Sequence, residues 1–186
     1  LAEAFVLLAR EPECDGRPEI AARKLAAIRR IADAAGAAGM VGGQAMDLQA
    51  AGHGCDADGL DAEGVRDMHA RKTGALIRAA AATGAIMAGA GPARVEAVDR
   101  YAAALGLAFQ IVDDVLDVEG TDGALGKTAG KDAAAGKPTY PALFGLDASK
   151  RLAREAADAA RAALAAEGLL DTRLAEIVAW VVSRSS

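Results

Sequence analysis

Three carboxylates fall within five residues of the segment Phe109–Asp117, which reads FQIVDDVLD. On a helix, Asp113 and Asp117 share one face with their Cβ atoms about 6 Å apart. Two ionised carboxylates at that separation repel each other by roughly 3 kcal/mol at an effective dielectric of 20, so a cation is expected between them. Oxygen ligands without nearby His or Cys favour a hard ion such as Mg²⁺, whose remaining positions water and phosphate oxygens can fill. A solvated acidic helix end is the alternative interpretation.

A glycine-rich segment follows these acids from Glu119 to Lys137, with five glycines and the lysines Lys127, Lys131 and Lys137. Glycines let the backbone approach a phosphate closely, and lysines neutralise its charge. A loop of this length within a compact domain is usually functional or disordered. We expect Lys127 and Lys137 to approach a bound diphosphate; the alternative is a surface loop whose lysines only add solubility.

Four further polar residues lie inside apolar helical segments: Lys72 and Thr73 in ARKTG, and Gln44 and Asp47 in GGQAMDL. A single lysine in such a place can simply extend its amine to solvent. Gln44 and Asp47 are one helical step apart, where a buried hydrogen-bonded pair is the simplest explanation. Taken with the carboxylates and the glycine-rich segment, however, these residues indicate a site that binds a diphosphate through Mg²⁺.

The elements that position these residues are predicted to be helices. The 186 residues include 50 Ala and 21 Gly but only one Trp, two Tyr and three Phe. This composition favours close-packed helices over a β-sandwich or barrel, and the length fits one all-α domain over residues 1–186. Apolar periodicity, Pro18 and Pro92 at helix starts, and Asp61 and Asp147 as N-caps predict helices over residues 1–10, 18–38, 40–51, 61–90, 92–118, 139–146, 148–167 and 171–183.

Charge and hydropathy exclude several classes of function. The chain carries 21 basic and 26 acidic residues, a net charge of −5, and no Lys/Arg-rich block, so no nucleic-acid partner is expected. The longest uncharged stretch, residues 79–93, is too short and too rich in Ala and Gly to span a bilayer. With no signal-peptide pattern at the start, a cytoplasmic location is the default expectation. Cys14 and Cys55 lack metal-ligand spacing and are interpreted as incidental thiols.

Five segments give the chain a resemblance to a known family: GMVGGQAMDLQA, ARKTGALI, GLAFQIVDDVLDVEG, LGKTAGKDAAAGKPTYPALFGL and the terminal helix ending in VVSR. The sequence resembles the short-chain trans-isoprenyl diphosphate synthases of the polyprenyl synthetase family, particularly the bacterial farnesyl or geranyl diphosphate synthases. The segments occur in the family's order and run from one end of the chain to the other. The resemblance implies a helical bundle of the isoprenoid-synthase type, a homodimer, and a prenyltransferase that condenses isopentenyl diphosphate with dimethylallyl or geranyl diphosphate to give a product such as farnesyl diphosphate.

The resemblance also implies roles for individual residues. FQIVDDVLD is similar to the family's second aspartate-rich motif, which implies Mg²⁺ ligation by Asp113 and Asp117 with Asp114 in support. The residues implied to contact the allylic diphosphate are Lys72, Thr73, Lys127 and Lys137. Gln110 and Gln44 are implied to line the prenyl end of the cavity.

The sequence departs from the family at its front. The family's first aspartate-rich motif, its chain-length-determining residues and its basic cluster for isopentenyl diphosphate belong upstream of Leu1. The chain is therefore interpreted as the C-terminal part of the family domain with the N-terminal portion missing, and these 186 residues alone are expected to be inactive. Two alternatives are a class I terpene cyclase, which requires an Asn-containing metal motif although the chain has no Asn, and a non-catalytic helical partner subunit, in which the acids and lysines would be eroded.

Overall fold

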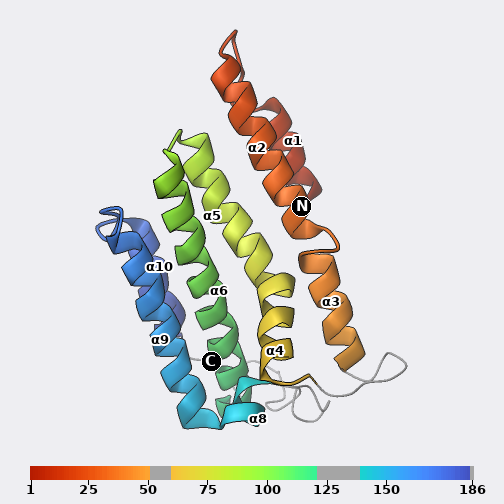
Figure 1. Ribbon diagram of the computed structural model, residues 1–186, viewed down its shortest axis with the longest axis vertical. Coiled ribbons are helices and arrows are strands. Elements are labelled where there is room, and N and C mark those ends of the chain that lie inside the picture. The colour runs from red at the N-terminus through yellow and green to blue at the C-terminus, as the bar shows by residue number, and fades with distance from the viewer. Residues whose placement is uncertain (51–59, 121–138, 185–186) are drawn as a thin grey trace.

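All regular elements of the described residues, 1–50, 60–120 and 139–184, are helices in the computed structural model (Figure 1). The expectation of an all-α fold is thereby confirmed. In chain order the elements are α1 (Ala2–Arg10), α2 (Pro18–Ala35), α3 (Met40–Leu48), α4 (Ala62–His69), the π-helix η2 (Ala70–Gly74), α5 (Ala75–Met87), α6 (Pro92–Glu119), α8 (Tyr140–Phe144), α9 (Leu146–Ala165) and α10 (Arg173–Ser183).

Most of the predicted helix starts are confirmed by the capping residues. Pro18 and Pro92 occupy the first turns of α2 and α6, where a missing N–H costs nothing. Asp61 caps α4, because its carboxylate accepts a hydrogen bond of 2.8 Å from the amide of Gly64. The N-cap expected at Asp147 is wrong: this residue lies inside the first turn of α9, where its charge faces the positive end of the helix dipole.

The single helix expected over residues 61–90 is divided into α4, η2 and α5. A π-helix accommodates an extra residue per turn and is found frequently at functional sites. Gly74, its last residue, lies directly against α6: a Cβ added to Gly106 would be 3.2 Å from the Gly74 Cα. The apolar pattern of the sequence did not reveal this interruption of the helix.

The main core forms around α6, which lies between α5 and α9 in Figure 1 and packs against both. It consists of buried side chains from α6, α9 and α10, with α5 covering it from the other side. The cluster comprises Tyr101, Ala102, Leu105, Ala108, Ala156, Ala157, Ala160, Leu164, Val178 and Val181. Half of these residues are Ala, so the helix axes must approach closely for the core to fill at normal packing density.

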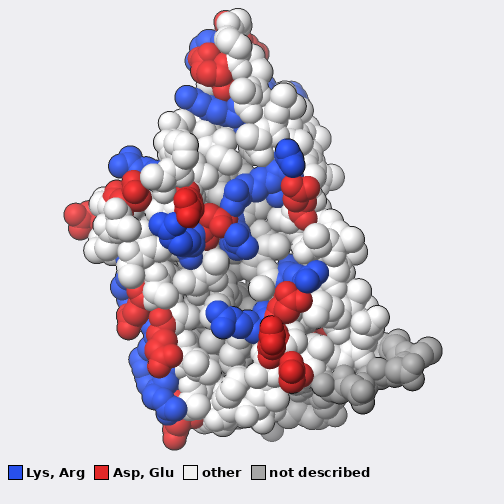
Figure 2. Space-filling model, in the orientation of Figure 1, with Lys and Arg blue, Asp and Glu red and all other residues white. Residues whose placement is uncertain are grey.

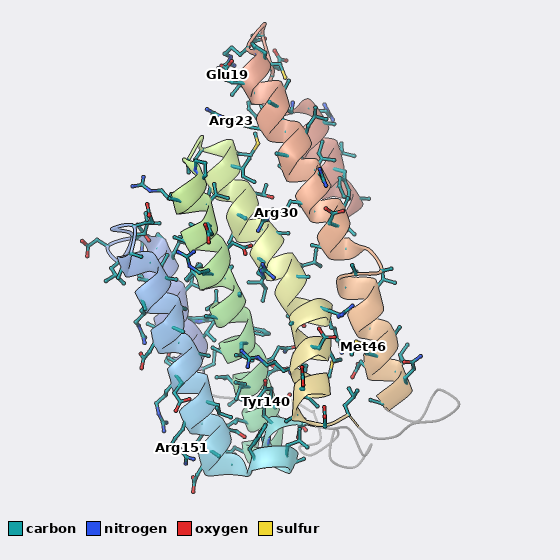
Figure 3. The ribbon with its side chains drawn as sticks, viewed as in Figure 1. Glu19, Arg23, Arg30, Met46, Tyr140 and Arg151 are labelled. Atoms are coloured by element: carbon teal, nitrogen blue, oxygen red, sulfur yellow. The ribbon has the colours of Figure 1, made fainter. Side chains whose placement is uncertain are left out.

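A second, smaller core lies at the end of the bundle where α6 terminates. Tyr140 of α8 is buried there with Val65, Ile111, Val112 and Ala153, and Figure 3 shows Tyr140 at the place where α4, α6 and α9 come together. This cluster joins the short helix α8 to the acidic end of α6. It therefore fixes the chain that follows the glycine-rich segment.

Figure 2 shows basic and acidic side chains interleaved over much of the face in view, whereas the flank on the side of α3 is largely uncharged. At one point Asp99 of α6 accepts ion pairs from Arg30 of α2 and from Arg78 of α5, the latter with a Nη2–Oδ2 distance of 2.6 Å. These pairs tie three helices together at the surface. Within the described residues, the helices are all too short or too polar to cross a lipid bilayer.

Tyr101 supplies a test of the main core. Its side chain is only 1% exposed, its hydroxyl donates a hydrogen bond of 3.0 Å to the Leu174 carbonyl, and burial raises the pKa of the phenol to about 12. Because the folded-state pKa lies above the unfolded value near 10, the stability that this group contributes is complete below pH 10 and is lost as the pH rises through the folded pKa. Two pKa units correspond to about 2–3 kcal/mol.

We therefore expect Tyr101→Phe to lower the free energy of unfolding by about 1 kcal/mol at pH 7, the usual value of one hydrogen bond. Above pH 11 the order should reverse, because the variant has no phenol to ionise. Urea unfolding of both proteins between pH 7 and pH 11.5 measures this. A difference in stability that stays constant over this range would contradict the assignment.

Candidate active site

The acidic end of α6 is the first component of the site. Asp113 and Asp117 lie one turn apart near the C-terminus of the helix, whose last turn contains no basic residue. Carboxylates at this end of a helix are unfavourable because the helix dipole is negative there. Other elements supply the cations: the Arg184 guanidinium contacts the Asp113 Oδ1 at 3.1 Å, and the Lys150 amine contacts the Glu119 Oε1 at 2.6 Å.

Asp114 has a structural contact with the helix α8. It is buried, and its Oδ2 accepts a hydrogen bond of 2.9 Å from the backbone N–H of Tyr140. Asp114 is about 100° around the helix from Asp113, and although it precedes Asp117 by only three residues, its carboxylate is bound to the first amide of α8. No group of three His, Cys, Asp or Glu in the described part of the chain is placed to hold a metal ion. Asp114 thus attaches α8 to the acidic end of α6.

Lys72 forms the second component, on the π-helix η2. Its Nζ lies 2.6 Å from the Oδ2 of Asp47 on α3, and the Asp47 side chain is only 13% exposed. The lysine therefore does not simply extend to solvent. The hydrogen-bonded pair considered for Gln44 and Asp47 is also absent, because Asp47 pairs with Lys72 while Gln44 is exposed. The structure thus does not join Gln44 to the other described site residues.

Thr73 and Gln110 connect the lysine-bearing element to the acidic helix. The Thr73 hydroxyl donates a hydrogen bond of 2.8 Å to the Gln110 Oε1. Gln110 precedes Asp113 by three residues and Asp117 by seven, a spacing that places all three on one face of α6. Thr73 therefore lies beside Gln110, on the face of α6 that also bears Asp113 and Asp117.

Gly43 brings α3 into contact with the backbone of η2. A Cβ added to this glycine would lie 2.2 Å from the Lys72 backbone nitrogen, a distance that no side chain can occupy. The contact places Asp47, one turn further along α3, beside the Lys72 amine. Sequence reasoning singled out neither Gly43 nor the roles of Asp47 and Arg184; the only signals were the glycine pair before Gln44 and an arginine near the end of the chain.

A separate groove of about 980 Å³ lies beside α6. Leu107 and Ile111 line it together with residues of α4, α8 and α9, including Arg66 and Arg151. Leu107 and Ile111 lie roughly 100° around α6 from the face that bears Gln110 and Asp113. The groove and the acidic face therefore point in different directions. None of the site residues named above lines it.

Two residues of the predicted site, Lys127 and Lys137, lie outside the described residues. Their contact with a diphosphate therefore remains a prediction from the sequence.

Comparisons with known proteins show the family and the fold of the chain. The model of the polyprenyl synthetase family matches residues 2–176. The farnesyl diphosphate synthase of Escherichia coli K12 is 44% identical over 173 residues, which cover 90% of this chain and 56% of the E. coli protein. The chain thus spans little more than half the length of this curated relative.

Two solved structures share the fold. An FPP/GFPP synthase from Zymomonas mobilis superposes with a TM-score of 0.77 at 32% identity, covering 97% of this chain and 57% of that one. A polyprenyl synthase from Caulobacter crescentus CB15, solved in complex with calcium and isoprenyl diphosphate, superposes with a TM-score of 0.74 at 28% identity, covering 100% of this chain and 63% of that one.

The close approach at Gly43 is directly testable. Gly43→Ala must push α3 away from η2, and we expect it to lower the free energy of unfolding by about 2 kcal/mol or more, in the range for overpacked interiors. Gly84→Ala on α5 is the matched control: nothing lies within 4 Å of its added Cβ, so the better helix propensity of Ala should stabilise the protein by about 0.5–1 kcal/mol. Denaturant unfolding measures both, and equal effects of the two substitutions would contradict the contact.

Proposed function

Because the chain belongs to the polyprenyl synthetase family, we propose that it forms the diphosphate-binding half of a prenyltransferase that joins isopentenyl diphosphate to an allylic diphosphate. The allylic substrate would be dimethylallyl or geranyl diphosphate, and the product a short-chain isoprenyl diphosphate such as farnesyl diphosphate. The relative from E. coli is named for the synthesis of such a product.

One observation carries the proposal: the Thr73–Gln110 hydrogen bond joins η2, which bears Lys72, to the face of α6 that bears Asp113 and Asp117. Carboxylates alone would attract any cation, and a lysine alone any anion. A divalent ion with a bound diphosphate satisfies both at once, because the metal neutralises the carboxylates while the ammonium neutralises the remaining phosphate charge.

Asp113 and Asp117 would hold the metal. Their oxygens suit Mg²⁺, which is usually bound through one or two carboxylates with substrate phosphates completing the shell. When bound, Mg²⁺ would supply charge stabilisation for the departing diphosphate. The Caulobacter relative, solved with calcium and isoprenyl diphosphate, supports a divalent ion beside such a substrate.

The chain's own residues would then position the diphosphate and stabilise the allylic group. Lys72 would exchange part of its contact with Asp47 for a phosphate oxygen, and Asp47 would keep the amine directed at the site. Gln110 and the Thr73 hydroxyl present oxygen atoms beside the acidic face, where they would stabilise positive charge developing on the allylic carbon. Lys127 and Lys137 would also contact the diphosphate, and Gln44 would line the prenyl end of the cavity.

We extend the proposal to a homodimer. Several large apolar side chains on α1, α2 and α3 are exposed, which is typical of a surface that another chain or segment covers. They are Leu1, Val6, Leu7, Leu25, Val41 and Leu48.

Binding tests the first half of the proposal. A mixture of Mg²⁺ and a bisphosphonate should raise the unfolding temperature of the chain, and Asp113→Ala should abolish that rise because it removes a metal ligand. Asp158→Ala on α9, where the carboxylate is 76% exposed and paired with Arg161, is the control and should leave the rise unchanged. Equal stabilisation of Asp113→Ala and the parent chain would remove Asp113 from the site.

Turnover tests the second half. We expect no prenyl transfer by the 186 residues alone. A hybrid that joins the front part of the E. coli enzyme to this chain should convert isopentenyl and geranyl diphosphates to a longer product. Asp113→Ala in the hybrid should lower kcat by about 100-fold or more, the usual effect of removing a group that stabilises charge in the transition state. A hybrid that binds Mg²⁺ and bisphosphonate yet forms no product would favour a non-catalytic subunit.

A further inference from the structure

Arg184 occupies an unusual place for a residue just beyond the last helix. Its guanidinium lies over the Phe109 ring of α6, with its central carbon 4.6 Å from the ring centre, and 5.7 Å from the ring centre of Trp180 on α10. Its side chain is only 21% exposed, and Nη2 contacts the Asp113 Oδ1 at 3.1 Å.

The two rings restrict the position of the Arg184 guanidinium. An exposed ion pair contributes little by itself, because holding two long side chains in one geometry costs conformational entropy. Stacking on aromatic faces holds a guanidinium plane through cation–π attraction, so less freedom remains to be lost when it binds a carboxylate. Phe109 and Trp180 thus hold Arg184 in place, and Asp113 receives a positive charge in a fixed position.

Asp113 nevertheless stays accessible to a second cation. Its side chain is 56% exposed, and Arg184 contacts its carboxylate through Oδ1. A divalent ion approaching Asp113 therefore competes with Arg184 for the negative charge, and it also repels the guanidinium.

We propose that Arg184 is a positioning residue that stands in for the metal at Asp113 and passes from this carboxylate to the incoming diphosphate when Mg²⁺ binds. The inference rests on the proposed function of the site. While the metal is absent, the arginine compensates a carboxylate at the negative end of α6. Once Mg²⁺ neutralises Asp113, the fork of N–H donors on Arg184 is released beside the metal and can bind phosphate oxygens in pairs.

The proposal predicts effects of opposite sign for one substitution. Arg184→Gln should bind Mg²⁺ alone about two- to five-fold more tightly, the range that an exposed ion pair withholds from a competitor. The same variant should bind Mg²⁺ with pyrophosphate several-fold more weakly, because a donor to the phosphate is lost. A purely structural role for Arg184 would shift both affinities in the same direction.

Calorimetric titration of the folded chain measures both affinities. Arg173→Gln is the matched control, since Arg173 lies at the start of α10, is 89% exposed and pairs with Glu176; it should change neither affinity. Trp180, the only tryptophan of the chain, gives an independent readout: its emission should change on Mg²⁺ addition in the parent and in Arg173→Gln, but not in Arg184→Gln or Asp113→Ala. Circular dichroism verifies that each variant is folded.

The outcomes separate this inference from the proposed function. Equal Mg²⁺ affinities of the parent and Arg184→Gln, or losses of the same sign with and without pyrophosphate, overturn the exchange while leaving the diphosphate site in place. Failure of every folded protein to bind Mg²⁺, with or without pyrophosphate, overturns both. Opposite shifts, together with a Trp180 signal that depends on Arg184, support the exchange.

Discussion

Two glycine contacts set the distances between the three helical segments that form the site. Gly43 of α3 sits on the Lys72 backbone of η2, and Gly106 of α6 sits on Gly74 at the end of the same π-helix. Without side chains at these positions, the three backbones approach closely, and polar side chains can reach from one element to the next. The Lys72–Asp47 ion pair and the Thr73–Gln110 hydrogen bond both depend on this approach.

Electrostatic repulsion opposes the fold at the C-terminal end of α6. Asp113, Asp117 and Glu119 gather at the negative end of α6, where a helix would favour cations. The structure compensates them from outside, with Arg184 beyond α10 and Lys150 from α9. An arrangement that is costly for the helix alone, and that distant segments make tolerable, is typical of a site kept for function rather than for stability.

Asp114 connects the functional site with the packing that stabilises the fold. It follows directly after Asp113, yet it is buried and holds the first backbone amide of α8, while its neighbour remains exposed. The chain that returns from the glycine-rich segment is thereby attached to the helix that bears the acids. One pair of adjacent aspartates thus connects the site to the smaller core around Tyr140.

Much of the architecture is contained in the sequence itself. Its Ala-rich, aromatic-poor composition and apolar periodicity determined an all-helical chain, with starts at Pro18, Asp61 and Pro92 that the structure confirms. The i, i+4 spacing also determined that Asp113 and Asp117 share a face, because that relation lies within one helix.

The tertiary structure alone decided the contacts between elements distant in sequence. Four features are of this kind: the π-helix η2 around Lys72, the pairing of that lysine with Asp47 rather than of Gln44 with Asp47, the turning of Asp114 toward α8, and the placement of Arg184 on Asp113. Each of them joins residues on different elements or depends on packing against another element. Local propensity carries no information on such contacts, because they arise only when glycine-permitted backbone approach and ring stacking bring separate helices together. The residue types that could bind a metal and a diphosphate were therefore readable from the chain, whereas their partners were set by the packing of the helices.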